Sequence, residues 1–251
     1  MTGELAGRVA IVTGAAGGLG QAICRGLVAS GASVALVDLK GEVLDALTTE
    51  LAAAAAAFPT DLTDRAAVQG LPDAVVERFG RLDIVVNNAG IRTVHPFAEH
   101  PVDAWQRALD VNLTAPFLLT QAAVAHLQAS GSGTVVNTTS TAAELAFGNR
   151  VAYNVSKAGL KMLTRTSALE LGPLGIRCNA VAPGVVETPL NSHYFQDADF
   201  SELIVSNTPV RHWGKPDDVA GPVVFLCSDS ARYVNGATIL VDGGWTTGKG
   251  Y

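Results

Sequence analysis

Short apolar runs rich in β-branched residues alternate with longer segments of helical periodicity along the whole chain. This alternation is typical of repeated strand–helix–strand units built around a parallel sheet. Most of the short runs are continuously apolar, which is the pattern of strands covered by helices on both faces. The sequence therefore predicts an α/β fold with a parallel sheet at its centre.

This pattern locates the expected elements. Strands are predicted at Arg8–Thr13, Ser33–Val37, Ala55–Pro59, Leu82–Val86, Gly133–Thr139, Ile176–Val181 and Thr238–Val241. Helices are predicted at Gly18–Ser30, Glu42–Ala54, Arg65–Phe79, Val102–Ala129, Val151–Leu171 and Pro216–Leu226. The 251 residues, 48% of them hydrophobic, can bury one large core, and no repeat or linker divides them. A single domain, 1–251, is therefore predicted.

Charge limits the classes of partner. The chain has 17 Lys and Arg against 23 Asp and Glu, a formal net charge of -6, and no basic cluster. Such a surface does not neutralise the phosphates of a nucleic acid or of an anionic membrane. We therefore expect a small-molecule substrate as the partner, with no nucleic acid and no membrane.

Cysteine content and hydropathy bear on location and assembly. Cys24, Cys178 and Cys227 lie far apart in apolar stretches, so we expect buried thiols in a reducing, cytoplasmic compartment. Residues Met1–Val12 lack the features of a secretory signal. The longest apolar run, Leu51–Phe58, is interpreted as a helix end, because it is far shorter than the roughly 20 residues that span a bilayer. A mean hydropathy of +0.28 with only 16% charged residues favours a homo-oligomer whose subunits cover apolar surface.

The segment Val185–Trp213 breaks the alternation. It has no strand pattern and carries aromatic residues and a histidine, namely His193, Tyr194, Phe195 and Phe200. Long irregular segments of this kind are often lids or binding loops. The alternative is a pair of short surface helices that pack their aromatic side chains on the core.

A glycine-rich turn follows the first predicted strand. Gly14 comes directly after Thr13, and Gly18 and Gly20 lie where a helix is predicted to begin. Without Cβ atoms the backbone can turn tightly and approach a pyrophosphate, whose charge a helix N-terminus stabilises. Such a turn can also merely connect two elements. Its place between a strand and an amphipathic helix favours nucleotide binding by this turn. Leu19 is counted among the binding residues of the turn.

Asp38 follows the second predicted strand, 18 residues after Gly20. A carboxylate there can accept hydrogen bonds from both ribose hydroxyls of an adenosine, and its charge repels a 2′-phosphate. The alternative, an aspartate that caps the next helix, is the weaker interpretation because strand end, spacing and glycine turn agree. The sequence therefore predicts NAD as the cofactor, although Lys40 partly offsets the repulsion.

Further motifs follow in a specific order: Asn87-Asn88-Ala89-Gly90, Asn112, Ser140, Tyr153-x-x-x-Lys157 and Pro183-Gly184. With the glycine turn, this set resembles the short-chain dehydrogenase/reductase family along essentially the whole chain. The resemblance implies a Rossmann-type, doubly wound sheet of seven parallel strands and a nicotinamide cofactor. It also implies assembly as dimers or tetramers, a homotetramer being expected here, and oxidation or reduction at an alcohol or carbonyl carbon.

The resemblance also assigns the cofactor site. It implies that Asp61 and Leu62 contact the adenine, that Asn88, Ala89 and Gly90 pack beside the cofactor, and that Thr188 meets the nicotinamide carboxamide. The cofactor-binding residues expected in full are Gly14, Gly18, Leu19, Gly20, Asp38, Asp61, Leu62, Asn88, Ala89, Gly90, Tyr153, Lys157, Pro183, Gly184 and Thr188.

Tyr153 and Lys157 are four residues apart on a predicted helix, so their side chains share one face. The ammonium and the positive nicotinamide ring are expected to lower the pKa of Tyr153 from ~10 and make it an acid/base. The Ser140 hydroxyl would hold the substrate oxygen, and Asn112 a water that links Lys157 to solvent. Each residue alone could be structural, but together Asn112, Ser140, Tyr153 and Lys157 predict catalysis. Direct hydride transfer needs no metal, and the histidines lack metal-ligand spacing.

Substrate is expected where the segments after Gly90, Ser140 and Gly184 converge, at the carboxyl ends of the strands. This placement favours the lid interpretation of 185–213. The polar candidates for substrate contact are Arg92, His95, Glu144, Asn149, Arg150, His193 and Tyr194, of which about half are expected to face solvent. Their polarity suits a hydroxylated or carboxylated substrate.

A narrower resemblance concerns the stretch Asn87–Arg92 with His95–Phe97, the stretch Arg211–Gly214 and the end Val241–Trp245. These resemble the sugar-acid branch of the family, which includes gluconate 5-dehydrogenase and 2-dehydro-3-deoxygluconate 5-dehydrogenase. Thr93 stands where that branch often has a second basic residue. We therefore expect interconversion of a secondary alcohol and a ketone on a sugar acid or polyol.

Three alternatives remain open. A 3-oxoacyl-carrier-protein reductase usually uses NADPH and offers a basic surface to its carrier, so Asp38 and the negative net charge argue against it. A general carbonyl reductase is the second alternative. The third is a protein that senses NAD without turnover, which would be expected to lack at least one of the four catalytic residues.

Overall fold

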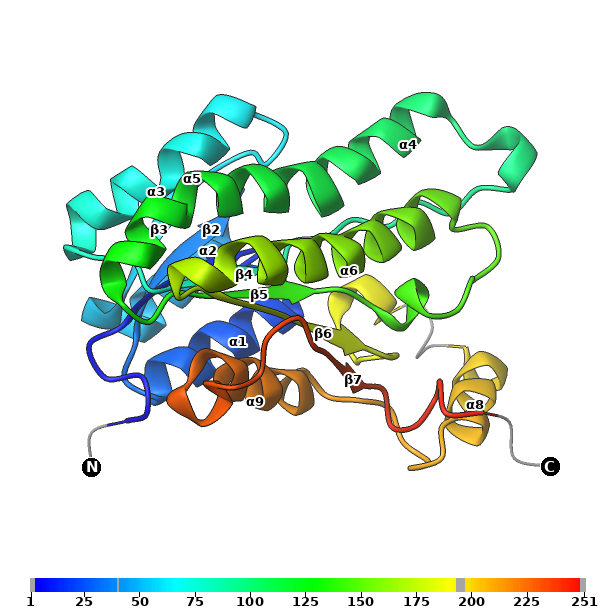
Figure 1. Cartoon of the computed structure of the whole chain (residues 1–251). Helices are drawn as coiled ribbons and strands as arrows, with labels where there is room; N and C mark the ends of the chain where they lie inside the picture. The colour runs from blue at the N-terminus through cyan, green and yellow to red at the C-terminus, as the bar shows by residue number, and fades with distance from the viewer. Residues whose placement is uncertain (1–2, 40, 193–196, 249–251) are drawn as a thin grey trace.

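A seven-stranded sheet, in which every neighbouring pair is parallel, forms the centre of the molecule (Figure 1). The computed structural model describes residues 3–39, 41–192 and 197–248. The strands are β1 (Val9–Thr13), β2 (Ser33–Asp38), β3 (Ala55–Pro59), β4 (Ile84–Asn87), β5 (Thr134–Thr138), β6 (Arg177–Pro183) and β7 (Thr238–Val241). Their order is β3-β2-β1-β4-β5-β6-β7, so the predicted doubly wound parallel sheet is confirmed.

Helices cover both faces of the sheet, as Figure 1 shows. They are α1 (Gly18–Ala29), α2 (Glu42–Leu51), α3 (Arg65–Phe79), α4 (Val102–Leu109), α5 (Ala115–Ser130), α6 (Val151–Leu171), α8 (Ala198–Asn207) and α9 (Pro216–Cys227). The side chains of β1 alternate between two hydrophobic clusters. Ala10 and Val12 belong to the cluster that includes α1 and α9, whereas Val9 and Ile11 belong to the one that includes α3 and α5. Burial on both faces explains why the strand sequences are continuously apolar.

The predicted helix Val102–Ala129 is interrupted by a π-helical turn, Asp110–Thr114, between α4 and α5. Sequence periodicity did not reveal it, because one inserted residue barely changes the pattern. Asn112 lies in this turn and is fully buried. π-Helical turns of this kind occur frequently at functional sites.

The apolar run Leu51–Phe58 is not simply a helix end, as the sequence analysis had it. Leu51 closes α2, a 3-10 turn follows over Ala52–Ala54, and Ala55 begins β3. Ala52 adopts a positive φ of 49°, which terminates the helix. The other elements agree with their predicted ranges to within one or two residues at each end.

The combined helix Val102–Ser130 is long and apolar enough to cross a membrane by length and composition. A core helix of a globular protein passes the same test. Leu119, Ala123 and Leu127 of α5 are fully buried in the cluster that includes β5 and α3. The apolar character of this helix is therefore explained by packing on the sheet.

The insertion 185–213 is closed at its base by an isolated parallel bridge between Val186 and Gly214. Glu187 N donates to the Gly214 carbonyl at 2.8 Å, and Gly214 N donates to the Val185 carbonyl at 3.1 Å. Within the insertion, Asp197 caps α8 by accepting a hydrogen bond from Phe200 N. The expected helical content is therefore present, although His193, Tyr194 and Phe195 lie outside the described residues.

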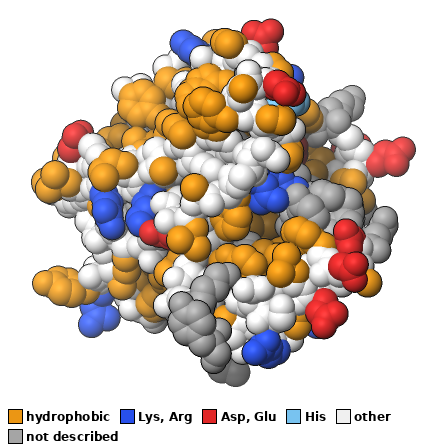
Figure 2. All heavy atoms as spheres, turned by 90° about the vertical axis from the view of Figure 1, so that its right-hand side faces the viewer, with side chains coloured by type: hydrophobic (Ala, Val, Ile, Leu, Met, Phe, Trp, Pro, Cys, Tyr) orange, Lys and Arg blue, Asp and Glu red, His pale blue; other side chains and the backbone are white. Residues whose placement is uncertain are grey.

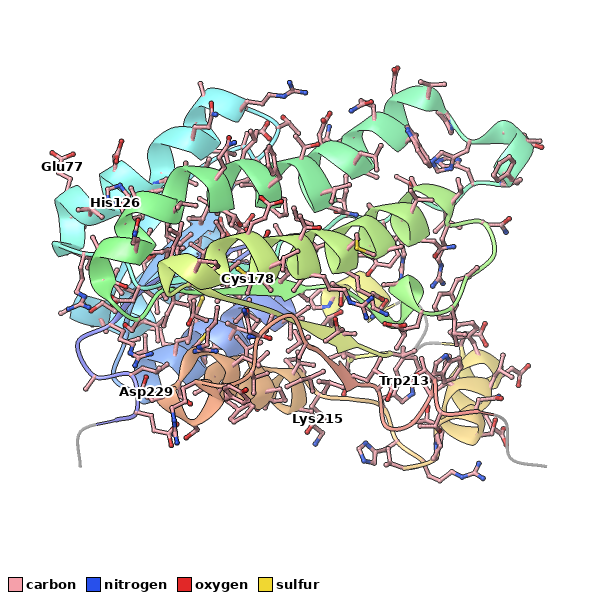
Figure 3. The ribbon with its side chains drawn as sticks, in the orientation of Figure 1. Glu77, His126, Cys178, Trp213, Lys215 and Asp229 are labelled. Carbon is pink, nitrogen blue, oxygen red and sulfur yellow. The ribbon has the colours of Figure 1, made fainter. Side chains whose placement is uncertain are left out.

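The three cysteines are free and buried, as predicted. Burial raises the pKa of each thiol to about 12. Figure 3 places Cys178 within the sheet. These thiols are therefore packing residues rather than nucleophiles.

Candidate active site

A cleft of about 630 Å³ lies at the carboxyl ends of the strands. It is lined by Ser140 and by all the residues predicted to bind the cofactor: Gly14, Gly18, Leu19, Gly20, Asp38, Asp61, Leu62, Asn88, Ala89, Gly90, Tyr153, Lys157, Pro183, Gly184 and Thr188. Segments separated by more than a hundred residues thus meet around one volume. A cleft of this size, centred where strand order reverses between β1 and β4, is typical of a nucleotide site.

The glycine turn forms a cradle that a side chain would fill. Gly14 has φ +68°, and a Cβ there would lie 2.8 Å from Ala89 Cα. A Cβ on Gly18 would lie 2.9 Å from Pro189 Cδ. Helix α1 begins at this turn with no capping side chain on Gly17. Its first N–H groups are therefore available to an anion, and the cradle fits a pyrophosphate.

Asp38 is held against the glycine turn at the end of β2. Its Oδ2 accepts a hydrogen bond from Ala16 N at 2.9 Å, and its Oδ1 accepts one from Leu39 N at 2.8 Å. Each carboxylate oxygen keeps a further lone pair. The charge is thereby fixed at the end of β2, with acceptor capacity left for ribose hydroxyls.

The end of β4 is tied to the glycine turn. Asn88 Nδ2 donates to the carbonyls of Thr13 at 3.0 Å and Gly14 at 3.2 Å. The Thr13 hydroxyl accepts from Asn88 N and Ala89 N at 3.0 and 3.1 Å. These bonds fix the two segments that flank the cradle relative to each other.

The opposite end of the cleft holds Ser140, Tyr153 and Lys157. Lys157 Nζ donates to the Thr138 carbonyl at 2.7 Å and lies 5.8 Å from the centroid of the Tyr153 ring. Ser140 and Tyr153 share a side-chain hydrogen bond. Helical spacing along α6 and the end of β5 therefore bring the three predicted groups together.

The pKa values of this end differ from the sequence prediction. Burial raises the pKa of Tyr153 above 10.0, and the hydrogen bond to Ser140, followed by the charges of Arg92 and Arg150, lowers it only in part. The Lys157 ammonium is directed to the Thr138 carbonyl and lies over the Tyr153 ring. Burial also lowers the pKa of Lys157 to about 8.

Asn112 does not line the cleft. Its Oδ1 accepts from Ile91 N at 2.8 Å, and its Nδ2 donates to the Ile91 carbonyl at 2.9 Å and to Ser156 Oγ at 3.0 Å. Both amide hydrogens are therefore used by protein partners. The side chain fixes the loop after β4 against α6. The expected role of Asn112 in holding a water that links Lys157 to solvent stays a prediction.

Arg92 lies beside the cleft rather than in its lining. Its Nη1 donates to Asn191 Oδ1 at 3.0 Å, and Asn191 Nδ2 donates to the Val186 carbonyl at 2.9 Å. Asn191 itself lines the cleft. Arg92 thus connects the loop after β4 with the insertion, and its charge acts on Tyr153.

Three further substrate candidates are not in the cleft lining. Glu144 is exposed and pairs with Lys161 Nζ at 2.6 Å. Asn149 is exposed, adopts φ 60°, and its carbonyl accepts from His95 N at 2.9 Å. The expected substrate contacts of Glu144, Asn149 and His95 are therefore not supported by their positions. His193, Tyr194 and also Lys40 lie outside the described residues.

The described histidines have local partners. The rings of His95 and His100 pack edge to face with centroids 5.2 Å apart. His126, at the surface end of α5 in Figure 3, lies 2.7 Å from Asp73. Among the residues that the structure describes, no group of three or more His, Cys, Asp or Glu could hold a metal ion.

The cleft also contains residues that sequence reasoning missed. They are Ala16, Gly17, Gln21, Leu39, Val43, Thr60, Thr63, Ile91, Arg107, Val111, Thr138, Thr139, Val186, Pro189 and Asn191. Many adjoin a residue that was predicted. Arg107 and Val111 do not follow a strand, and the helical period through Asn112 was the signal that could have found them.

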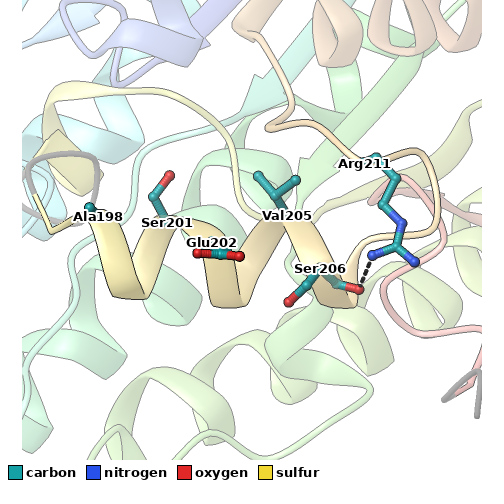
Figure 4. A pocket seen from close by; sticks show the side chains of 6 residues that line it. All are labelled: Ala198, Ser201, Glu202, Val205, Ser206 and Arg211. Carbon is teal, nitrogen blue, oxygen red and sulfur yellow. Dashed lines mark hydrogen bonds between the residues drawn. The ribbon is translucent and has the colours of Figure 1, made fainter.

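A second hollow lies between α8 and Arg211 (Figure 4). It is lined by Ala198, Ser201, Glu202, Val205, Ser206 and Arg211. Arg211 Nη1 donates to the Ser206 carbonyl at 2.7 Å and so closes the end of the helix. None of the residues predicted for catalysis lines this hollow.

The sequence matches the model of a family described as "Enoyl-(Acyl carrier protein) reductase" over residues 14–246. A D-threitol dehydrogenase from Mycolicibacterium smegmatis is 39% identical over 246 residues, covering 97% of this chain and 94% of the relative. An L-rhamnose 1-dehydrogenase (NAD(P)(+)) from Azotobacter vinelandii is 38% identical, covering 94% and 96%. A 3beta-hydroxysteroid dehydrogenase from Eggerthella lenta is also 38% identical, covering 100% and 98%.

Solved structures agree in fold. A protein from Agrobacterium tumefaciens assigned as a gluconate dehydrogenase superimposes with a TM-score of 0.93 at 35% identity, covering 98% of both chains. A protein from Beutenbergia cavernae assigned as an NAD(P)-dependent gluconate 5-dehydrogenase, with NADP bound at low occupancy, gives 0.90 at 36% identity, covering 97% and 98%. These relatives are thus named as dehydrogenases of substrates that differ widely.

Proposed function

The chain belongs to the short-chain dehydrogenase/reductase family, and from this premise we propose that it is an NAD-dependent dehydrogenase of a small polar secondary alcohol. One observation carries the proposal. Ser140, Tyr153 and Lys157 meet at one end of a cleft whose other end presents the fixed carboxylate of Asp38. This pairing of an acid/base group with a nucleotide cradle is what hydride exchange at an alcohol requires.

The residues of the chain supply binding and proton transfer. The nicotinamide ring, when bound, accepts hydride from the substrate carbon or returns it. The Tyr153 phenolate takes the proton from the substrate hydroxyl and becomes the phenol, which returns that proton in the reverse direction. The Ser140 hydroxyl holds the same oxygen. Lys157 remains largely protonated at neutral pH, because its pKa of about 8 lies above 7. Its positive charge next to the ring favours the phenolate over the phenol.

Asp38 supports NAD over NADP. Its carboxylate cannot turn away from the ribose site without breaking the hydrogen bonds from Ala16 N and Leu39 N. A 2′-phosphate placed there would meet a like charge, at a cost of roughly 1.4 kcal/mol or more. Two of the relatives are named as NAD(P)-dependent, so the preference of this chain for NAD over NADP has to be measured.

A sugar acid or polyol is the proposed substrate class. The relatives include enzymes named for threitol, rhamnose and gluconate, all of which are polyhydroxy compounds. Arg92 and Arg150 place positive charge near Tyr153, which suits a substrate with a carboxylate or many hydroxyls. The insertion 185–213 is proposed as the substrate lid, since Val186, Thr188 and Asn191 line the cleft.

We also propose a homotetramer in the cytoplasm. Helix α6 exposes Val155, Met162 and Leu169 at seven-residue intervals, with Leu169 78% exposed. Phe97, 82% exposed, and Val102 contribute apolar surface before and at the start of α4, and Figure 2 shows hydrophobic side chains gathered on this side of the molecule. Surface of this kind is typical of subunit interfaces. Light scattering at micromolar concentration should give a multiple of 25.9 kDa, and a monomer would refute the assembly.

The function is tested by offering the purified protein NAD with polyols, sugar acids and cyclic alcohols while following the absorbance of NADH. NADH should form with at least one polyol or sugar acid, and the Tyr153→Phe variant serves as the blank. NADH binding without turnover on any alcohol would favour a sensor. Reduction of 3-oxoacyl thioesters, with polyols and sugar acids inert, would replace the assignment by acyl-chain chemistry.

A further inference from the structure

The cleft has an end that neither the pyrophosphate nor the nicotinamide can occupy. The glycine turn binds in the middle, and Tyr153 and Lys157 mark the end where chemistry takes place. The remaining end is lined by Asp38 and Leu39, by Val43 of α2, by the loop 60–63, and by Arg107 and Val111. On the proposed function, this end must receive the adenine.

Two groups of residues with different chemistry line this end. Leu39 and Val43 come from the layer of α1 and α2 and are 58% and 49% exposed, which is high for apolar side chains that line a cleft. Arg107 comes from the last turn of α4, and Val111 from the π-helical turn that follows, in the layer on the other side of the sheet. A flat ring placed between the two groups would cover apolar surface on one side and meet a cation on the other.

Arg107 has no ion-pair partner within 4 Å of its guanidinium among the residues of the described ranges. The pKa of Asp61 is lowered mainly by hydrogen bonds to its Oδ1 from Thr63 N at 2.9 Å and Thr63 Oγ1 at 2.8 Å, and only last by the charge of Arg107. Arg65 differs from Arg107 in two respects. Its guanidinium pairs with Asp110 at 3.9 Å, and it does not line the cleft. Arg107 is thus a cation directed to the cleft and not committed to a surface salt bridge.

We infer that Arg107 is an adenine-binding residue, whose planar guanidinium covers the ring against the apolar wall of Leu39 and Val43. This rests on the proposed function. Guanidinium groups stack on flat aromatic surfaces because they are planar and weakly hydrated. A lysine at the same place would carry the charge but not the planar face. The role therefore depends on shape, and not on charge alone.

The competing explanation is that Arg107 attracts the cofactor phosphates through its charge. The two explanations differ for ligands that lack adenine. Stacking predicts that Arg107 contributes to binding of NADH and ADP-ribose and not to nicotinamide mononucleotide, whereas phosphate attraction predicts a contribution to all three. They also differ for Arg107→Lys, which keeps the charge.

The test measures dissociation constants of NADH, ADP-ribose and nicotinamide mononucleotide by titration calorimetry. Arg107→Gln should weaken NADH and ADP-ribose about 5-fold or more and leave the mononucleotide within twofold. Arg107→Lys should recover less than half of the loss, and the matched control Arg65→Gln should change none of the three.

Equal weakening of all three ligands, or full recovery by Arg107→Lys, would overturn stacking in favour of charge. Unchanged NADH binding in Arg107→Gln would overturn the inference altogether. If the unmodified protein fails to bind NADH, the proposed function itself fails, and that outcome is distinct from the other two. Circular dichroism and melting temperature establish that each variant is folded.

Discussion

The two ends of the cleft are built in different ways. At the catalytic end, Lys157 and Ser140 are buried, and Ser140 shares a hydrogen bond with Tyr153, so these groups are held in place. At the adenosine end, Leu39 and Arg107 have exposed side chains, and Arg107 forms no ion pair with the part of the chain that the structure describes. From this difference we expect the catalytic end to determine the rate of hydride transfer. The adenosine end is expected to determine cofactor affinity, to which each residue adds a small contribution of its own.

Loss of the Tyr153 hydroxyl at the catalytic end is expected to have the largest effect, and this effect is on turnover. Tyr153→Phe keeps the ring that packs against Lys157 but removes the proton donor and acceptor. Turnover should fall by ~100-fold or more, because general acid/base catalysis contributes at least this much. Steady-state NADH formation measures it, and an activity of a tenth of wild type or better would remove Tyr153 from its role.

Burial of the Lys157 ammonium at the catalytic end should also lower the free energy of unfolding, by an amount that depends on pH. Burial depresses the pKa of Lys157 from 10.5 to about 8, so between these values the unfolded chain binds more protons than the folded one. The free energy of unfolding therefore rises with pH in this window, by about 2 kcal/mol between pH 8 and 10. Urea titrations give the free energy of unfolding at each pH, and its rise with pH should be present in wild type and absent in Lys157→Met. Parallel pH profiles for the two proteins would show that the pKa of Lys157 is not lowered in the folded state.

Lys157→Met also affects the reaction. The variant loses the positive charge beside the phenol, so residual alcohol oxidation should begin at higher pH than in wild type. A pH–rate profile gives the midpoint. An unchanged midpoint with reduced rate would mean that Lys157 acts only by orienting the cofactor and the Thr138 segment.

At the adenosine end a tenfold effect is expected. Wild type should prefer NAD over NADP by about tenfold, or roughly 1.4 kcal/mol. Asp38→Ala should narrow the preference by weakening NAD and relieving the repulsion of the 2′-phosphate. The ratio of kcat/KM for the two cofactors reports this, and equal efficiencies in wild type would contradict the role of Asp38.

The smallest effect concerns Arg92, which lies beside the catalytic end. If its charge also meets a substrate carboxylate, Arg92→Ala should raise KM for sugar acids by ~10-fold and change KM for neutral polyols little. Asn191→Leu is the matched control, because it removes the hydrogen-bond partner of Arg92 and keeps the charge. An equal rise for acids and polyols would make Arg92 a residue that only holds the insertion in place.

The sequence predicted the groups that follow strands and those with helical spacing. Gly14, Asp38 and Ser140 lie at strand ends that a parallel sheet must bring to one edge, and Tyr153 and Lys157 share a helix face. Local geometry and topology determine these positions, so they could be inferred without coordinates.

Side-chain partners could not be predicted in this way. Glu144 pairs with Lys161, and Asn112 is taken up by Ile91 and Ser156, because packing of separate segments decides such contacts. Arg107, in the last turn of α4, and Val111, in the π-helical turn that follows, line the cleft at a point that no strand end marks. These are tertiary effects, and residue type alone does not reveal them.

The central claim, that chemistry and adenosine binding belong to opposite ends, is tested most directly by one crossed measurement. Single-turnover hydride transfer at saturating NAD and the dissociation constant of NADH are determined for Tyr153→Phe and Asp38→Ala. The account predicts that Tyr153→Phe slows transfer ~100-fold or more with binding within threefold, and that Asp38→Ala weakens binding while transfer stays within threefold. Parallel losses of rate and binding in both variants would contradict it.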